Sequence, residues 1–461
     1  MNPLRILRST AAIALIVAAP SVAGAHGLLR SSSPAADTVL AAPPTEIRLT
    51  FTEAPERTFT RVRLMGLNGH VFTRPVEILP GNVAVARISA RLEPGEYRVE
   101  WQTAGDDGHP VTGSFTFTVA PSPSAATAES VAHVPSPAAH MPEMGKTPEV
   151  DPFASLAAVL RWLTLVGAIA AIGTIAFRYT VLARVSLEVD TEIRTGYLPD
   201  AARRAASVGA VAATLLLAVG VARLLLQSLA IHGSEEMFRP TMLSAMVTET
   251  NWGLGWITQL AGTLVALAGF LLARRGRSSA WPIAATGCAA VAIGLALASH
   301  AAVVPRLSGL SVVANVVHTV AAAGWLGNLL LVFAVGLPLA WRLDRADRWT
   351  VVRDVVHAFS PAALAFGGLA AATGIFMAWT HVGSIAALID TDYGNVLLLK
   401  VGLLSLTALT GAYNWLRVRP TLGDHAAAHR LRRTAGAELA IATLVLAVTA
   451  VLVALPMPLS Q

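Results

Sequence analysis

The segment from Trp252 to Leu272 reads WGLGWITQLAGTLVALAGFLL and contains no charged side chain. About 20 consecutive apolar residues are enough for an α-helix to cross the hydrocarbon core of a bilayer. Further segments of this kind lie after Pro152, and together they predict an all-α polytopic membrane domain of eight transmembrane helices. The predicted spans are Phe153 to Leu182, Ala205 to Ile231, Trp252 to Leu272, Trp281 to Ser299, Leu310 to Leu339, Val355 to Thr380, Asn395 to Leu416 and Ala435 to Leu455.

The overall composition agrees with a membrane protein. Of the 461 residues, 54% are hydrophobic and only 13% are charged, and the mean hydropathy is +0.60. This is too apolar for a soluble protein of two domains. The net charge of +6 and the pI of about 10.1 would suit nucleic-acid binding. Most arginines, however, lie in short loops between the apolar spans, as in membrane proteins, so we exclude nucleic acid as a partner.

The arginines also predict the orientation of the spans. The four loops predicted to face the cytoplasm hold 16 arginines, whereas the three loops on the other side hold two, Arg239 and Arg306. Cytoplasmic loops of membrane proteins carry such an excess. We therefore expect a multi-pass protein of a bacterial inner membrane, with both ends of the mature chain outside the cytoplasm.

The chain before the spans has a different pattern. From Thr45 to about Ala120, apolar and polar residues alternate, and turn sequences such as Pro80-Gly81 separate the alternating runs. Alternation with period two is typical of half-buried β-strands. We predict an N-terminal all-β sandwich of Ig-like or cupredoxin-like type with antiparallel strands. The residues expected to face its core include Ile47, Leu49, Phe51, Tyr97, Val99, Trp101, Phe115, Phe117 and Val119.

The first residues resemble an export signal. Arg5 and Arg8 precede an apolar run, and Ala23-Gly24-Ala25 is a small-residue site of the type that signal peptidase cleaves. Cleavage after Ala25 makes His26 the first residue of the mature chain. We therefore expect a signal peptide at 1–25, the sandwich at 26–120, a linker rich in Pro, Ala and Ser at 121–150, and the membrane domain at 151–461.

A histidine at the mature N-terminus is a candidate metal ligand. The amine and the imidazole of His26 form a chelate that suits copper(II). His109, in an Asp-Gly-His sequence, would add a second imidazole, and Asp107 a carboxylate. Glu53, just after a predicted strand, is a further candidate oxygen ligand. Each residue alone is a weak indication, because a lone loop histidine is usually a solvated surface residue, but their combination favours a metal site.

These motifs resemble the CopC family of periplasmic copper-binding domains. The resemblance rests on His-Gly-Leu-Leu-Arg-Ser-Ser-Ser-Pro-Ala from His26, on Leu-Thr-Phe-Thr-Glu ending at Glu53, and on Trp101 followed by Asp-Gly-His-Pro-Val-Thr-Gly-Ser-Phe from Asp107. It implies copper(II) ligands at His26, Asp107 and His109. Because Met65 is the only methionine of the predicted sandwich, we expect no strong copper(I) site there.

The membrane half is similar to the CopD family. The similarity rests on Ser299-His300-Ala301, His318, Gly324-Trp325-Leu326-Gly327, Tyr393-Gly394, Leu399-Lys400, Asn414 and Glu438. Asn328 departs from the Trp-x-Gly-Gly form of the family. A CopC–CopD fusion implies copper uptake or copper resistance, with copper ions, the lipid bilayer and periplasmic copper chaperones as partners. Copper(II) is then expected in the sandwich, and copper(I) is the candidate ion in the membrane domain.

Ionisable groups within a bilayer are costly and therefore candidates for function. The candidate membrane ligands of copper are His300, His318, His232 and His381. His318 lies deeper in its span than the others, which sit at the predicted outer ends. An alternative for the end histidines is that they only anchor helices at the interface. Lys400 and Glu438 lie at different depths, so we expect each to have a separate partner or a wet cavity.

Two other functions fit part of the sequence. A histidine brace also serves copper monooxygenases, but a carboxylate such as Asp107 would fill the position that oxygen chemistry needs open. Pairs of histidines on helices can hold haem, which makes a membrane cytochrome the second alternative. The sequence contains neither a P-loop nor a phosphorylation motif for ATP-driven pumping. We predict a protein that binds and transports copper and is not an enzyme.

Overall fold

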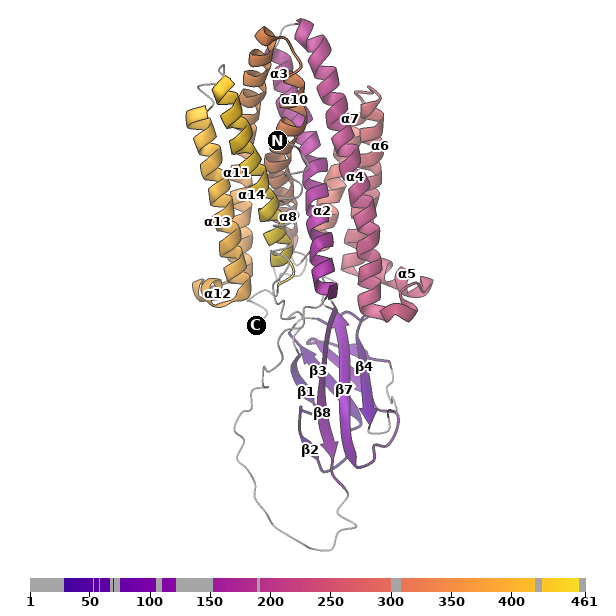
Figure 1. Ribbon diagram of the computed structural model, residues 1–461. Coiled ribbons are helices and arrows are strands. Elements are labelled where there is room, and N and C mark those ends of the chain that lie inside the picture. Colours follow the sequence, from indigo (N-terminus) through magenta and orange to yellow (C-terminus); the bar gives the residue numbers. More distant parts are fainter. Residues whose placement is uncertain are drawn as a thin grey trace. The chain divides into compact units, whose positions relative to one another are not determined.

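The computed structural model describes residues 29–52, 54–57, 59–66, 69, 75–104, 110–121, 152–188, 191–299, 308–418 and 425–455. Two compact units divide the chain, one within Ser21–Pro152 and one within Phe153–Gln461. The first unit is built from β-strands and the second from helices (Figure 1). This agrees with the fold class predicted from the sequence.

The first unit contains two four-stranded sheets. One sheet has the strand order β1-β3-β6-β5 and the other has the order β2-β8-β7-β4. The strands are β1 (Leu29–Ser33), β2 (Val39–Leu40), β3 (Glu46–Phe51), β4 (Arg61–Gly66), β5 (Glu77–Leu79), β6 (Val83–Arg87), β7 (Gly95–Ala104) and β8 (Pro110–Val119).

The core of this unit includes the alternating apolar residues that the sequence singles out. All of them are buried except Phe115, which is partly buried and packs against the core. The rings of Tyr97 and Phe117 stack with centroids 5.6 Å apart, and the rings of Phe51 and Trp101 meet edge to face at 5.2 Å. The last pair connects the two sheets, because Phe51 ends β3 and Trp101 lies near the end of β7.

One strand pair differs from the all-antiparallel prediction. Strand β2 pairs with β8 in parallel, with Val39 opposite Thr118 and Leu40 opposite Val119, whereas the other pairs are antiparallel. The alternation of apolar residues shows which side chains face the core but not which strand lies beside which. A strand of two residues is also too short to show a period.

The second unit is helical throughout its described length. Its long helices are interrupted by π-helical segments, which carry the prefix η. The elements are α2 (Pro152–Ala176), η2 (Phe177–Leu182), α3 (Ala183–Glu188), α4 (Thr191–Glu236), α5 (Pro240–Thr248), α6 (Asn251–Arg274), α7 (Ala280–Leu297), α8 (Ser308–Ala322), η4 (Ala323–Gly327), α9 (Asn328–Leu331), η5 (Val332–Gly336), α10 (Leu337–Ala340), α11 (Arg345–Val382), α12 (Ile385–Asp390), α13 (Asp392–Tyr413), η6 (Asn414–Val418) and α14 (His425–Leu452).

Seven of the predicted spans are confirmed as helices long and apolar enough to cross a membrane, within the described residues. The eighth prediction needs correction. Helix α14 is 28 residues long, and Gly436–Leu452 within it is an apolar stretch shorter than the seven spans above. The sequence HRLRR in its first turns is strongly basic, and the regular helix ends before the predicted limit at Leu455. The predicted limit at Leu455 is thus corrected to Leu452.

Successive helices run in opposite directions, so the connections alternate between the two ends of the helical unit. Helices α3 and α10 lie at one end, and the short helices α5 and α12 lie at the other (Figure 1). Close packing inside the unit uses small residues. A Cβ added to Gly262 of α6 would lie 2.7 Å from the carbonyl oxygen of Gly287 of α7. Glycine at such positions lets membrane helices approach closely.

Candidate functional site

The candidate ligands of the sandwich, His26, Glu53, Asp107 and His109, lie outside the described residues. Their described neighbours on the strands can nevertheless be located. Leu29, at the start of β1, pairs with Phe51, at the end of β3. The chain therefore enters β1 and leaves β3 at the same end of one sheet. His26 precedes this pair by a few residues, and Glu53 follows it.

The second sheet brings a further candidate segment to the same end of the sandwich. Ala104 and Pro110, the last pair of the β7–β8 hairpin, flank residues 105–109. The buried hydroxyl groups of Thr103 and Thr60 lie 2.8 Å apart. Thr60 belongs to the connection that leads from the end of β3 into β4. The edge-to-face contact of Phe51 with Trp101 joins the same two strand ends across the core.

His318 is held in one orientation by the neighbouring helix. Its Nδ1 lies 3.0 Å from the carbonyl oxygen of Ala370 and 3.1 Å from Oγ1 of Thr373, both in α11. A carbonyl oxygen only accepts, so Nδ1 carries the hydrogen and donates. Thr373 in turn donates to the carbonyl oxygen of Leu369 at 2.7 Å. In the neutral imidazole the lone pair is then on Nε2, the atom that can bind a metal ion.

His300 lies outside the described residues, but the residue before it is described. Oγ of Ser299 accepts a hydrogen bond from Nδ2 of Asn315 at 2.8 Å. Asn315 lies three positions before His318 on α8, and residues with this spacing share a helix face. This hydrogen bond therefore connects the end of the fourth span to α8, at a residue one helical turn before His318.

His232 and His381 are both buried and both lie where a helix stops. Helix α4 is interrupted at Gly233, where φ is 75°, and α11 ends before Gly383, where φ is 70°. Nδ1 of His232 lies 3.2 Å from Oγ of Ser228. Nδ1 of His381 lies 3.2 Å from the hydroxyl oxygen of Tyr393 in α13. These contacts within and between helices favour the interpretation that the two histidines stabilise helix ends.

The described residues contain no group of three or more His, Cys, Asp or Glu side chains that could hold a metal ion. The histidines predicted to face one side of the membrane domain thus do not form a single described centre.

Lys400 and Glu438 do not form an ion pair with each other in the described chain, as we expect from their different depths. Glu438 is buried, and its Oε1 accepts a hydrogen bond of 2.6 Å from Nδ2 of Asn414. Asn414 is the first residue of the π-helical segment η6. The separate partner expected for the buried carboxyl group is therefore an amide on the neighbouring helix.

The departure at Asn328 has a structural explanation. This side chain is fully buried, and its Nδ2 donates to Oγ1 of Thr180 at 2.9 Å. The preceding Gly327 packs on Gly173, where an added Cβ would lie 2.4 Å from the Cα of Gly327. The backbones of the two helices thus touch at Gly173 and Gly327. Next to this contact, the side-chain amide of Asn328 reaches Thr180 on the facing helix.

Sequence reasoning missed most of the groups that orient the histidines. Ser228 lies four positions before His232, a spacing that indicates contact on a helix, so this partner could have been found. Thr373 and Tyr393 carry no such signal. Thr373 is 55 positions from His318, and only the packing of α8 on α11 brings them together.

Comparison with known families accounts for most of the chain. The family model of the CopC domain matches residues 29–120. The model of the copper resistance protein D-like N-terminal domain matches residues 151–310, and that of copper resistance protein D matches residues 353–452. The CopC match lies in the first structural unit, and the two copper resistance protein D matches correspond to the second.

Individual relatives agree with these matches. The chain is 26% identical over 454 residues to the copper transport protein CutJ of Bacillus subtilis (strain 168), covering 96% of this chain and 76% of that protein. It is 35% identical over 114 residues to copper resistance protein C of Escherichia coli, covering 23% of this chain and 90% of that protein. The crystal structure of PcoC, a methionine rich copper resistance protein from Escherichia coli, aligns with 21% of this chain and 99% of its own, at 34% identity and a TM-score of 0.19. The chain belongs to the copper resistance family, as a fusion of a CopC domain with a CopD membrane domain.

Proposed function

We propose that this protein binds copper(II) in a periplasmic sandwich and moves copper across a bacterial inner membrane through its helical unit. The observation that carries the proposal is the convergence of strand ends in the sandwich. The described neighbours of His26, Glu53 and the 105–109 segment meet at one end of the two sheets. Ligands from separate segments can surround one ion only if their strands end close together.

The proposed copper(II) ligands are His26, Asp107 and His109, with Glu53 as a further candidate. The amine and imidazole of an N-terminal histidine, a second imidazole and a carboxylate form a nitrogen and oxygen set that suits copper(II). This proposal requires removal of the signal peptide after Ala25. A coordinating carboxylate leaves little room for oxygen chemistry, which favours binding over catalysis.

In the helical unit we propose that copper passes His318, with His300 on the same route. The hydrogen bond from His318 Nδ1 to Ala370 supports this role, because it leaves Nε2 as the atom available to a metal ion. The hydrogen bond from Asn315 to Ser299 supports a position of His300 near His318, because Ser299 immediately precedes His300 in the sequence. His232 and His381 are weaker candidates, since both are held at helix ends. Periplasmic copper chaperones are proposed as donors to the sandwich.

Cellular copper content tests the transport proposal. A deletion strain should contain less copper than the wild type if the protein imports copper, and more if it exports copper, measured by mass spectrometry of washed cells. Unchanged copper content over a range of external copper concentrations would contradict transport in either direction.

A matched pair of variants tests the route within the membrane. His318→Ala should reproduce the copper content of the deletion strain while reaching the membrane in normal amounts. His357→Ala, which changes an exposed histidine on α11, should behave as the wild type. Normal copper content in the His318→Ala strain would remove His318 from the route.

A further inference from the structure

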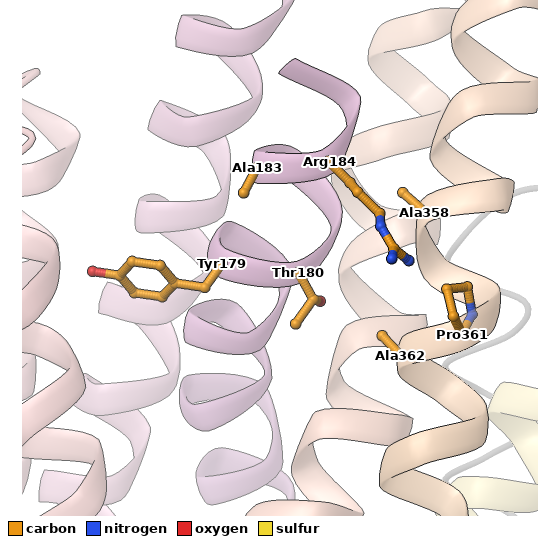
Figure 2. Close-up of a pocket in the computed structure, with 7 residues that line it drawn as sticks. All are labelled: Tyr179, Thr180, Ala183, Arg184, Ala358, Pro361 and Ala362. Carbon is orange, nitrogen blue, oxygen red and sulfur yellow. The ribbon is translucent and has the colours of Figure 1, made fainter. Parts of the chain in front are cut away.

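A groove opens between the segment η2–α3 and helix α11, and none of its lining residues is a candidate copper ligand. Its volume is about 410 Å³, which lies within the range of about 300 to 1,000 Å³ typical of small-molecule sites. Its seven lining residues are Tyr179, Thr180, Ala183, Arg184, Ala358, Pro361 and Ala362 (Figure 2). Arg184 and Thr180 point toward α11, whereas Tyr179 points the opposite way.

The local sequence explains why the helices leave this space. The turns at Phe177–Leu182 are π-helical, and such a bulge widens a helix locally and often marks a functional site. Across the groove, Pro361 lies inside α11 and removes one helical hydrogen bond. The other residues on that wall are alanines, whose short side chains do not fill the gap. The hydroxyl of Thr180 is already engaged, since it donates to Ala176 and accepts from Asn328.

Charge distinguishes this groove from an ordinary apolar helix surface. Arg184 is exposed, is the only charged residue among the seven that line the groove, and has no acidic partner within the described part of the chain. A guanidinium group binds phosphate oxygens through two parallel N–H donors. The lining residues include no carboxylate that would repel an anion.

The position of the groove identifies the class of anion. Both walls belong to helices long and apolar enough to cross a membrane, Ser155–Ser186 and Asp347–Val382. Arg184 lies near the α3 end of the first of these, and the alanines and Pro361 extend from it toward the interior of the second. A cationic group at the end of an apolar groove between membrane helices is complementary to a phospholipid, with its phosphate on the arginine and an acyl chain along the groove.

We propose that this groove binds one anionic phospholipid, with the phosphodiester on Arg184 and an acyl chain against Ala358, Pro361 and Ala362. The groove is smaller than a whole phospholipid. It therefore holds the headgroup and the first part of one chain, and the remainder stays in the bilayer. This site does not depend on the copper route and stands independently of the proposed function.

The experiment uses the full-length protein, purified in detergent and mixed with phosphatidylglycerol or with phosphatidylcholine of the same chains. Native mass spectrometry counts the lipids that remain bound. The unmodified protein should retain one phosphatidylglycerol at least about tenfold more strongly than phosphatidylcholine, because the choline ammonium offsets the negative charge of the phosphodiester that Arg184 binds. Arg184→Gln should lose this preference, and Arg184→Lys should keep most of it.

Two controls separate the groove from general basic charge. Arg274→Gln removes an exposed arginine from the end of α6 and should leave the lipid preference intact. Ala362→Leu keeps Arg184 but fills the groove, and it should weaken retention of phosphatidylglycerol. An unchanged preference in Arg184→Gln, an equal loss in Arg274→Gln, or displacement of the lipid by inorganic phosphate alone would each overturn the proposal.

Discussion

The sandwich and the helical unit hold their candidate copper ligands in different ways. In the sandwich the candidates precede or follow strands in the sequence, and the described ends of those strands lie at one end of the sheets. In the helical unit His318, His232 and His381 lie within helices, and each has an Nδ1 contact to a fixed neighbour. The first arrangement allows several ligands to close around one ion, whereas the second presents single imidazoles in set orientations.

This difference fits the two tasks that we propose. A protein that takes copper from dilute solution needs several ligands on one ion, because affinity grows with the number of preorganised donors. A protein that passes copper through a membrane needs contacts weak enough to release it, as for ions in channels.

The largest expected effect concerns the frame of the sandwich. Phe51→Ala removes a ring that is almost fully buried and contacts Trp101 across the two sheets. We expect the free energy of unfolding of the sandwich to fall by about 3 to 5 kcal/mol, measured by urea denaturation. Val39→Ala changes an exposed residue and should alter it by less than about 0.5 kcal/mol. Similar losses from both changes would mean that the ring contact does not hold the sheets together.

The next effect concerns the proposed ligands at that end. His109→Ala should weaken copper(II) binding by about 100-fold, or about 2.8 kcal/mol, in competition titrations of the mature sandwich. His70→Ala removes another histidine of the same domain and should change the affinity less than about twofold. A comparable loss from His70→Ala would show that copper(II) binds elsewhere. The same titrations should give much weaker binding of zinc than of copper(II).

The smallest effect concerns the orientation of His318. Thr373→Val removes one of the two acceptors of Nδ1 but leaves the Ala370 carbonyl in place. We expect the difference in cell copper content between this variant strain and the deletion strain to be about threefold smaller than that between the wild type and the deletion strain. The loss of a supporting partner weakens a histidine ligand without removing it. Thr380→Val serves as the control, because it alters a threonine of the same helix whose hydroxyl donates to the carbonyl oxygen of Met377. No difference between the two variants would make Thr373 irrelevant to His318.

The fold could be predicted where side-chain periodicity is strong. The alternation at Ile47, Leu49 and Phe51 correctly predicted a strand with one buried face, because each of the three is buried. Apolar length alone located the long helices. The parallel pairing of β2 with β8 and the π-helical segments could not be predicted, since both depend on what packs beside the segment rather than on its own sequence.

The candidate site could be predicted only in part. His318 was identified from its depth in an apolar span, but the groups that fix its tautomer lie on α11, far along the chain. The partner of Glu438 was likewise missed, because an asparagine 24 positions earlier carries no local sign of contact. The ligand assignment in the sandwich and the four domain limits stay predictions.

We propose that the amine of His26 anchors copper(II), and the addition of one residue before His26 tests this role. An alanine placed before His26 turns the amine into an amide and moves the new amine away from the imidazole chelate. Strand β1 begins only at Leu29, so the extended sandwich should fold with an unchanged melting temperature in the metal-free form. Copper(II) affinity, measured by competition with a chelator of known affinity, should fall by orders of magnitude. The copper(II) affinity of the unextended form should also fall as the pH drops through about 7.7 and about 6.5, where free amines and imidazoles become protonated. Equal copper(II) affinity of the two forms at neutral pH would contradict the claim.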